Sequence, residues 1–218
     1  MPTVVPAPFL FRFALPVRRV AELPRNSAPW LRLEGECRLP APAELDGGLV
    51  FAELRAAWND DGLAMAAAVS GKKFPPFCDP NDTNRSDGLR LWFDTRDTKG
   101  VHYGTRFCQH FCLMPSGSGK NGLEPTVVPL PVPRAREDAP IPDPDDVLIW
   151  SKIDKNGYQI EAWFPASALS GYDPASQPRL GFFYHVHDSE LGDQFFTVGP
   201  PFPVASDPSL WGTLTLEQ

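Results

Sequence analysis

The sequence lacks the features that mark a membrane protein, a secretory precursor or a protein that binds nucleic acid. Its 218 residues hold no run approaching the stretch of about eighteen apolar residues that a membrane helix needs. The N-terminus has no charged start, apolar block and cleavage site in the order of a secretory signal. The net charge of −7 is opposite to the basic surface that nucleic acid binding needs. We therefore expect a cytoplasmic protein with no membrane and no nucleic acid partner.

Motifs of common enzyme classes are also missing. The sequence has no Gly-x-Ser-x-Gly, no His-Glu-x-x-His and no complete phosphate-binding glycine loop. Cys108 and His110 lie side by side on one predicted strand, which is a poor arrangement for a nucleophile and its base. Asp94 and Glu161 are carboxylates, but no pattern places them face to face as a glycosidase pair. We expect a protein that is not an enzyme.

Cysteine is scarce, and helical periodicity is absent. The four cysteines, Cys37, Cys78, Cys108 and Cys112, allow two disulfides in a secreted protein and stay reduced in the cytosol, and the missing signal favours reduced thiols. No segment shows a convincing 3.6-residue repeat of apolar residues. The 26 prolines disfavour long helices and favour short strands joined by extended loops.

Alternating apolar and polar residues predict a series of short strands. Asn59–Gly62 and Lys155–Gly157 have the composition of tight hairpin turns. The only helix-like piece is Ala166–Ser170. The pattern predicts an all-β, antiparallel β-sandwich that forms one domain over residues 1–218. The expected strands are Phe9–Leu15, Leu49–Trp58, Leu63–Ser70, Gly88–Asp94, Thr105–Leu113, Val147–Ile153, Tyr158–Phe164, Leu180–His187, Gln194–Val198 and Gly212–Leu216.

A proline-rich segment interrupts this series between Pro115 and Asp146. It begins with glycine and serine, holds eight prolines and ends in an acidic run. A disordered linker between two domains is one interpretation. Only about 70 residues follow the segment, so we prefer a long loop inserted in one sandwich, lying over a sheet or beside a binding face.

The stretch Asn84–Asp97 predicts a strand with two different faces. Because side chains alternate along a strand, Leu89, Leu91 and Phe93 form one face and are expected in the core. The opposite face carries a cation, an indole and a carboxylate, from Arg90, Trp92 and Asp94. These groups suit the recognition of a small polar ligand such as a sugar.

Other predicted strands extend this polar face. Glu161 lies in an otherwise apolar strand and therefore needs a buried partner, a metal or a ligand. If the strands share one sheet, the face also gathers cysteines, histidines and a second indole. Its expected members are Arg90, Trp92, Asp94, Cys108, His110, Cys112, Glu161, Trp163, His185 and His187.

Several functions compete for this face. In a sugar or polyol site, Trp92 and Trp163 stack on the ligand while polar groups bind hydroxyls, and these ligand-binding residues are Arg90, Trp92, Asp94, Glu161, Trp163, His110 and His185. In a zinc site, the ligands are Cys108, His110, Cys112 and His187, with His185 as an alternative to His187. Haem would need His110, His185 or Met114 as an axial ligand, without a covalent attachment motif. The remaining alternative is that the cysteines are small core residues and the histidines make local hydrogen bonds.

Five motifs in order give the chain a family resemblance. They are Trp58–Leu63; Ser86–Leu89 with Leu91–Asp94; Gly157–Ala162 leading into Phe164–Pro165; Leu180–Phe182 leading to Val186–Asp188; and Trp211–Leu216. With these motifs the chain resembles the family 9 carbohydrate-binding modules and the wider DOMON-like group of β-sandwich proteins, whose members bind sugars in some cases and haem in others.

The resemblance implies a binding function and, in related modules, calcium near the binding loops. Asp79–Asp82 together with Asp87 has the oxygen ligands that calcium prefers, although a solvated turn explains the same residues. Calcium and zinc are therefore the two cofactors considered. We expect a non-catalytic carbohydrate-binding module. The alternatives are a zinc- or haem-binding DOMON-like protein and a subunit that binds a protein partner.

Overall fold

The computed structural model of the protein describes residues 5–218, without the side chain of Asp46. Residues 1–4 lie outside the described residues, and they include the start of the segment that was searched for a secretory signal. No helix in the described part of the chain is long and apolar enough to cross a membrane. Its helical pieces are short 3-10 turns at Ala7–Leu10, Gly35–Cys37, Pro42–Asp46, Pro144–Asp146, Ala166–Ala168 and Pro208–Leu210.

Residues 5–218 form eleven strands that share one continuous hydrogen-bonded sheet. The order of the strands is β6-β5-β4-β9-β11-β1-β2-β3-β8-β7, and β10 pairs with β9. All pairs are antiparallel except those that β1 makes with β11 and β2. The strands are β1 Ala14–Arg19, β2 Ala52–Asn59, β3 Gly62–Ser70, β4 Gly88–Asp94, β5 Cys108–Ser118, β6 Glu124–Leu130, β7 Leu148–Ile153, β8 Gly157–Pro165, β9 Arg179–Asp188, β10 Gly192–Phe195 and β11 Gly212–Glu217.

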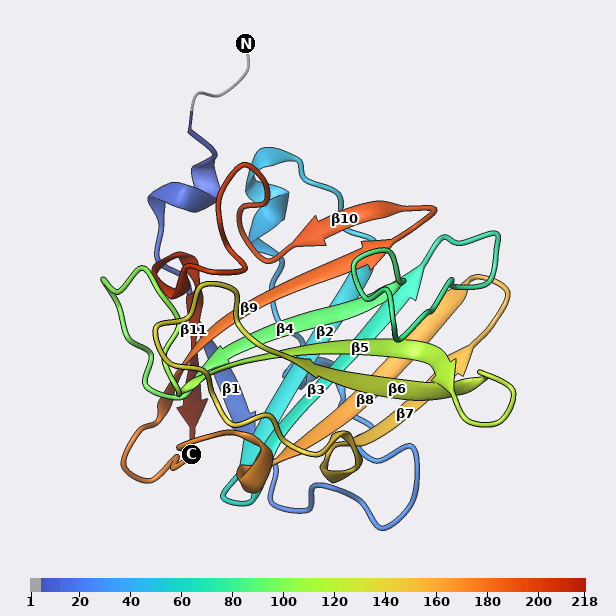
Figure 1. The fold of residues 1–218 in the computed structure, drawn as a ribbon, viewed down its shortest axis with the longest axis horizontal. Coiled ribbons are helices and arrows are strands. Elements are labelled where there is room, and N and C mark those ends of the chain that lie inside the picture. The colour runs from blue at the N-terminus through green and yellow to red at the C-terminus, as the bar shows by residue number, and fades with distance from the viewer. Residues whose placement is uncertain (1–4) are drawn as a thin grey trace.

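The sheet folds over into two layers, which confirms the predicted all-β sandwich. In Figure 1, β4, β5 and β6 cross in front of β2, β3 and β8, while β1 and β11 connect the layers at one side. At the other side the two ends of the sheet approach each other: Ser151 Oγ on β7 donates a hydrogen bond to the carbonyl of Pro115 on β5. The result is a nearly closed sandwich.

Two strand predictions need correction. The predicted strand Phe9–Leu15 is wrong: Ala7–Leu10 is a 3-10 turn, and the strand is Ala14–Arg19, which finds partners in both β11 and β2. The strand predicted at Gln194–Val198 is shifted to Gly192–Phe195, where the chain pairs with β9.

The predicted loop Pro115–Asp146 is wrong in its first half. Residues 115–118 end β5, and Glu124–Leu130 form β6, so the segment contains a hairpin. Alternation was hidden there by Pro125 and Pro129. Both prolines are tolerated because β6 is the edge strand of its layer, where an N–H can be missing from the ladder. Between Leu130 and β7 the chain forms no strand, and its one helical piece is the 3-10 turn Pro144–Asp146.

Aromatic rings from both layers fill the space between them. The ring centroid of Phe164 on β8 lies 4.8 Å from that of Phe111 on β5 and 5.4 Å from that of Phe93 on β4. Leu89, Leu91 and Phe93 are all buried, as their alternation predicted. The main core therefore lies on the inner faces of the two layers.

A second, smaller core lies on the outer face of β2, β3 and β8. Leu23, Leu31 and Leu33, from the segment after β1, cover Trp163 and the small residues Ala57 and Ala64. This outer face is therefore partly closed by residues 20–37, while its remaining part stays accessible.

Candidate functional site

The residues predicted to share one polar face lie in different parts of the sandwich. Arg90, Trp92, His110 and His185 lie on the outer face of β4, β5 and β9, where Trp92 is paired with His110 and Arg90 with His185. Glu161 and the other indole belong to β8 in the opposite layer. Alternation had identified the face of each strand but not the layer.

Arg90, Trp92 and His110 form a buried group, which we term the Trp92 row. The indole of Trp92 is 3% exposed, and it stacks on the ring of His110 with centroids 4.2 Å apart. Arg90 Nη2 donates hydrogen bonds to the carbonyls of Thr83 and Ser86, so the loop before β4 covers the guanidinium. Trp92 therefore has little ring surface free for stacking on a sugar.

The Trp92 row contains polar atoms without partners. Among the described side chains, Arg90 Nη1 and Trp92 Nε1 are buried and make no hydrogen bond. Burial lowers the pKa of His110 to about 3, although the backbone of Pro131 opposes the shift, and the ring is neutral. The cavity beside His110 is only ≈ 10 Å³, the size of one water, and has no room for a sugar or a haem.

Asp94 serves the turn that follows β4. Its carboxylate accepts hydrogen bonds from the backbone N–H groups of Arg96 (3.0 Å) and Thr98 (2.7 Å). Burial raises the pKa of Asp94, and these two hydrogen bonds oppose the increase. The side chain is thus committed to the backbone.

Glu161 and Trp163 hold the covering segment in place. Glu161 accepts hydrogen bonds from the N–H of Leu31 (2.8 Å) and of Arg32 (3.0 Å), which supplies the buried partner that the sequence required. Trp163 is buried in the smaller core beneath Leu31 and Leu33. Both side chains therefore anchor residues 20–37 to β8.

The cysteines are free and buried to different extents. All four are unpaired thiols. Burial raises the pKa of Cys108 and of Cys112 to about 11, so both are protonated near neutral pH. Among the described residues, the ligand atoms of Cys108, His110, Cys112 and His187 do not come together in one group.

The loop considered for calcium does not fit that ion. Asp87 accepts hydrogen bonds from Lys72 Nζ (3.0 Å) and from the backbone N–H of Ser189 (2.7 Å), and the same ammonium lies 2.7 Å from both oxygens of Asp188. A buried lysine thus supplies the positive charge there. Asp79 instead accepts hydrogen bonds from Asn81 within its own turn.

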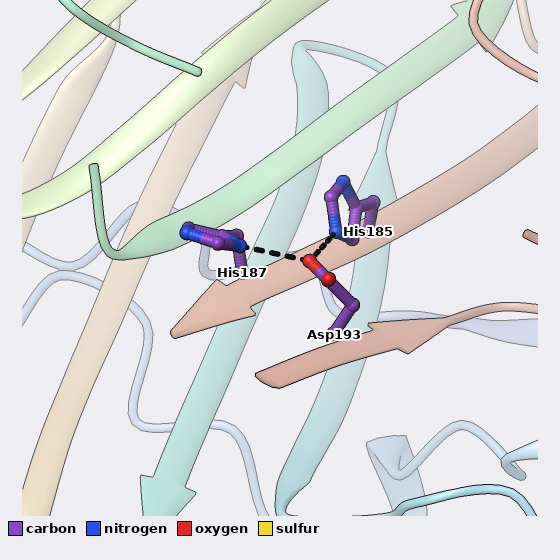
Figure 2. A group of neighbouring side chains, drawn as sticks. All are labelled: His185, His187 and Asp193. Atoms are coloured by element: carbon purple, nitrogen blue, oxygen red, sulfur yellow. Dashed lines mark hydrogen bonds and ion pairs between the residues drawn. The ribbon is translucent and has the colours of Figure 1, made fainter. Parts of the chain in front are cut away.

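His185 and His187 lie together on β9 and share one partner. Figure 2 shows both rings directed at the carboxylate of Asp193 on β10, which pairs with His187 across the hairpin. Burial lowers the pKa of His185 to about 4, although its hydrogen bond to Asp193 opposes the shift. We name His185, His187 and Asp193 the hairpin triad.

The open part of the β2-β3-β8-β7 outer face forms a groove of ≈ 290 Å³, close to the lower end of small-molecule sites at about 300 Å³. Its floor consists of small residues, including Ala66 and Ala68. Polar and aromatic side chains form its walls. This Trp150 groove is lined by Arg32, Glu53, Arg55, Trp150, Gln159 and Glu161, among others.

The strand register places Trp150 in this groove. Trp150 on β7 is paired with Glu161 on β8, and the floor residue Ala66 of β3 is the next partner of Glu161 across the sheet. Alternation along the predicted strand Val147–Ile153 is the sequence pattern from which the face of Trp150 could have been inferred. No local pattern pointed to Arg32, because the path of residues 20–37 is set by tertiary contacts.

Some groups in the groove are engaged and others are free. Arg55 Nε and Nη2 donate to Glu53 Oε1 at 2.8 and 2.6 Å, and Arg55 Nη1 donates to the carbonyl of Leu33. Within the described structure, neither the guanidinium of Arg32 nor the amide of Gln159 has a hydrogen-bond partner. Arg32 also has a φ of 46°, in the left-handed region, and Glu161 holds its backbone N–H in that conformation.

Comparison with known proteins identifies the fold. No family model matches the chain, and no curated protein matches it in sequence. A family 9 carbohydrate-binding module from Caldicellulosiruptor kristjanssonii in complex with cellotriose is 16% identical, with a TM-score of 0.61 over 94% of each chain. The module from the same organism in complex with glucose is 15% identical, with a TM-score of 0.62 over 94% of this chain and 96% of that one.

A third structure agrees with the first two. It is a protein from Bacteroides uniformis to which carbohydrate binding has been ascribed, 14% identical, with a TM-score of 0.57 over 95% of this chain and all of that chain (100%). The chain therefore has the fold of the family 9 carbohydrate-binding modules, which confirms the resemblance drawn from its motifs.

Proposed function

We propose that the protein is a non-catalytic carbohydrate-binding module that takes one or a few sugar units into the Trp150 groove. One observation carries this proposal: a half-buried indole lies beside two uncommitted hydrogen-bond donors, those of Arg32 and Gln159, over a floor of alanines. A sugar ring presents an apolar face and a rim of hydroxyls. The indole suits the apolar face, and a guanidinium or an amide suits the hydroxyls.

The arrangement of charges in the groove supports recognition of a neutral polyol. Arg55 and Glu53 neutralise each other, and Glu161 is held by two backbone N–H groups. The free donors then lie on an otherwise compensated surface. The resemblance in fold to modules solved with glucose and cellotriose supports the same ligand class.

The carboxylates of the groove favour binding over glycoside hydrolysis. Hydrolysis needs one carboxyl group as a proton donor and another as a base or nucleophile, both facing the sugar. Glu53 is engaged by Arg55 and Arg38, and Glu161 by backbone N–H groups. Neither carboxylate is therefore free to act as the proton donor or as the base or nucleophile.

A serine, a histidine and an aspartate lie together elsewhere, but they do not form a nucleophile and base. Ser209 Oγ and Asp207 Oδ2 both lie 3.0 Å from the same atom, Nδ1 of His102. A catalytic triad needs the serine at one ring nitrogen and the carboxylate at the other. This cluster supports the non-catalytic interpretation.

Calorimetric titration with glucose, cellotriose and a panel of other sugars tests the proposal. Trp150→Ala should weaken binding of the sugar that binds best by about five- to thirty-fold, about 1–2 kcal/mol, since it removes the stacking surface. Phe74→Ala, which removes an aromatic ring 70% exposed outside the groove, should leave the affinity unchanged. If Trp150→Ala and the wild type bind the sugar with equal affinity, the Trp150 groove is not the sugar-binding site.

The Trp92 row is the second candidate position for the ligand, because it holds buried polar atoms without partners. Trp92→Phe keeps an aromatic ring there and removes the indole N–H. If Trp92→Phe weakens sugar binding while Trp150→Ala does not, the ligand lies in the Trp92 row, and a rearrangement of the covering loop must open it.

A further inference from the structure

The hairpin triad has the composition of a metal site. Two imidazoles and a carboxylate form the only group, among the described side chains, of three histidine, cysteine or acidic residues whose ligand atoms all lie within 4.8 Å of one another. The triad lies in the layer opposite the Trp150 groove and shares no residue with it.

The strand geometry explains why these three side chains converge. His185 and His187 are two residues apart on β9 and therefore point to the same face. Asp193 is the direct partner of His187 on β10, and Phe195 is the partner of His185. The ring of His185 stacks on Phe195 with centroids 4.3 Å apart, which holds that imidazole toward the carboxylate.

Both histidines contact the same oxygen atom. His185 Nε2 lies 2.7 Å and His187 Nδ1 2.8 Å from Asp193 Oδ1 (Figure 2). Around a tetrahedral zinc ion, bonds of about 2.0–2.1 Å place ligand atoms about 3.3 Å apart. Each histidine nitrogen thus needs to move away from the Asp193 oxygen by only about 0.6 Å, and all three side chains are partly exposed.

The surroundings of Asp193 leave its negative charge available. Within the described structure, its only hydrogen-bond and ion-pair partners are the two histidines, and no lysine or arginine contacts it. Asp87 and Asp188 differ, because the ammonium of Lys72 forms an ion pair with both. The carboxylate of Asp193 is therefore the one positioned beside two nitrogen ligands and without a competing cation.

We propose that His185, His187 and Asp193 bind a zinc ion, with the fourth coordination position open to water or to an exogenous ligand. Imidazole nitrogen favours zinc over calcium or magnesium, which take oxygen ligands. On binding, a neutral imidazole carries its proton on the ring nitrogen that faces away from Asp193, and an imidazolium releases one proton to solvent, so that the nitrogen facing Asp193 donates its lone pair to the ion. This ligand set differs from the one predicted from the cysteines of β5.

Titration of chelator-treated, tag-free protein with zinc chloride, followed by calorimetry, tests the proposal. We expect one zinc ion per chain. His187→Gln and Asp193→Asn should each lower the affinity at least tenfold. His102→Gln is the matched control, because His102 also contacts an aspartate but has no second imidazole beside it, and it should bind zinc as the wild type does. Absence of stoichiometric binding, or unchanged affinity in both triad variants, overturns the proposal.

A spectrum of the wild-type protein with cobalt(II) in place of zinc gives a readout that does not depend on any variant folding. Nitrogen and oxygen ligands give visible d–d bands without a thiolate-to-cobalt charge-transfer band. A thiolate-to-cobalt charge-transfer band in the near ultraviolet would instead place the metal on the cysteines and contradict the proposal that the hairpin triad binds it.

Discussion

Replacing Lys72 with methionine should lower the free energy of unfolding by about 3–5 kcal/mol, because it leaves two buried carboxylates without their counter-ion. Lys72 Nζ lies 2.7 Å from both oxygens of Asp188 and 3.0 Å from Asp87 Oδ2. The three side chains are at most 2% exposed, so water cannot replace the ammonium. The cost is therefore that of a broken buried ion pair and not of a surface pair.

The pH dependence of this contribution follows from the pKa of Lys72. Burial by itself lowers that pKa, but hydrogen bonds to Asp188 and Asp87 outweigh burial and raise it above 10.5. The folded pKa lies above the unfolded value, so the stabilisation is fully present below pH 10.5 and is lost as the pH rises through the folded pKa.

Urea unfolding at pH 7, followed by circular dichroism, measures the effect. For a slope of about 2.5 kcal/mol/M, the midpoint should fall by about 1–2 M. Lys73→Met is the matched control, because the neighbouring side chain is exposed and makes no ion pair in the described structure. If the two variants unfold within about 1 kcal/mol of each other, the ion-pair reasoning is refuted.

Three further predictions concern the covering segment of residues 20–37, the thiols and the core. Glu161→Gln should lower the free energy of unfolding in urea by about 1–3 kcal/mol and speed hydrogen exchange of the Leu31 amide, because an amide side chain has one acceptor oxygen for two N–H groups. Unchanged exchange at Leu31 would contradict this prediction. Cys108 and Cys112, whose pKa values burial raises to about 11, should resist a thiol reagent at pH 8 and react only after unfolding; rapid labelling of the native protein would show that they are accessible. Phe164→Ala should cost about 3–5 kcal/mol, since its fully buried ring meets two phenylalanines of the other layer, and a loss below about 1 kcal/mol would mean that the layers are not in contact there.

Local sequence patterns predicted the strands well where pairing follows the alternation. Gly88–Asp94 is a strand with the predicted bounds, and its apolar side lies in the core. Turn residues likewise located the hairpin between β2 and β3, where Asn59 pairs with Gly62. Period-two alternation and turn chemistry are local properties, so one sequence is enough to reveal them.

The candidate site depended on information that is not local. Alternation placed Arg90 and Glu161 on outer faces, but strand order puts them in opposite layers. What covers each face is set by distant segments, the loop of Thr83 and Ser86 over Arg90 and residues 20–37 over Trp163. For the same reason the Trp150 groove, which needs the register of four strands and the path of that covering segment, could not be found from spacing.

The central claim, that the Trp150 groove binds carbohydrate, is tested most directly by a crystal structure of the protein soaked with cellotriose or with the sugar that binds best in calorimetry. The account predicts density for a sugar ring stacked on Trp150, with hydroxyls in reach of Arg32 and Gln159. A sugar bound elsewhere on the protein, with the groove empty, would contradict it.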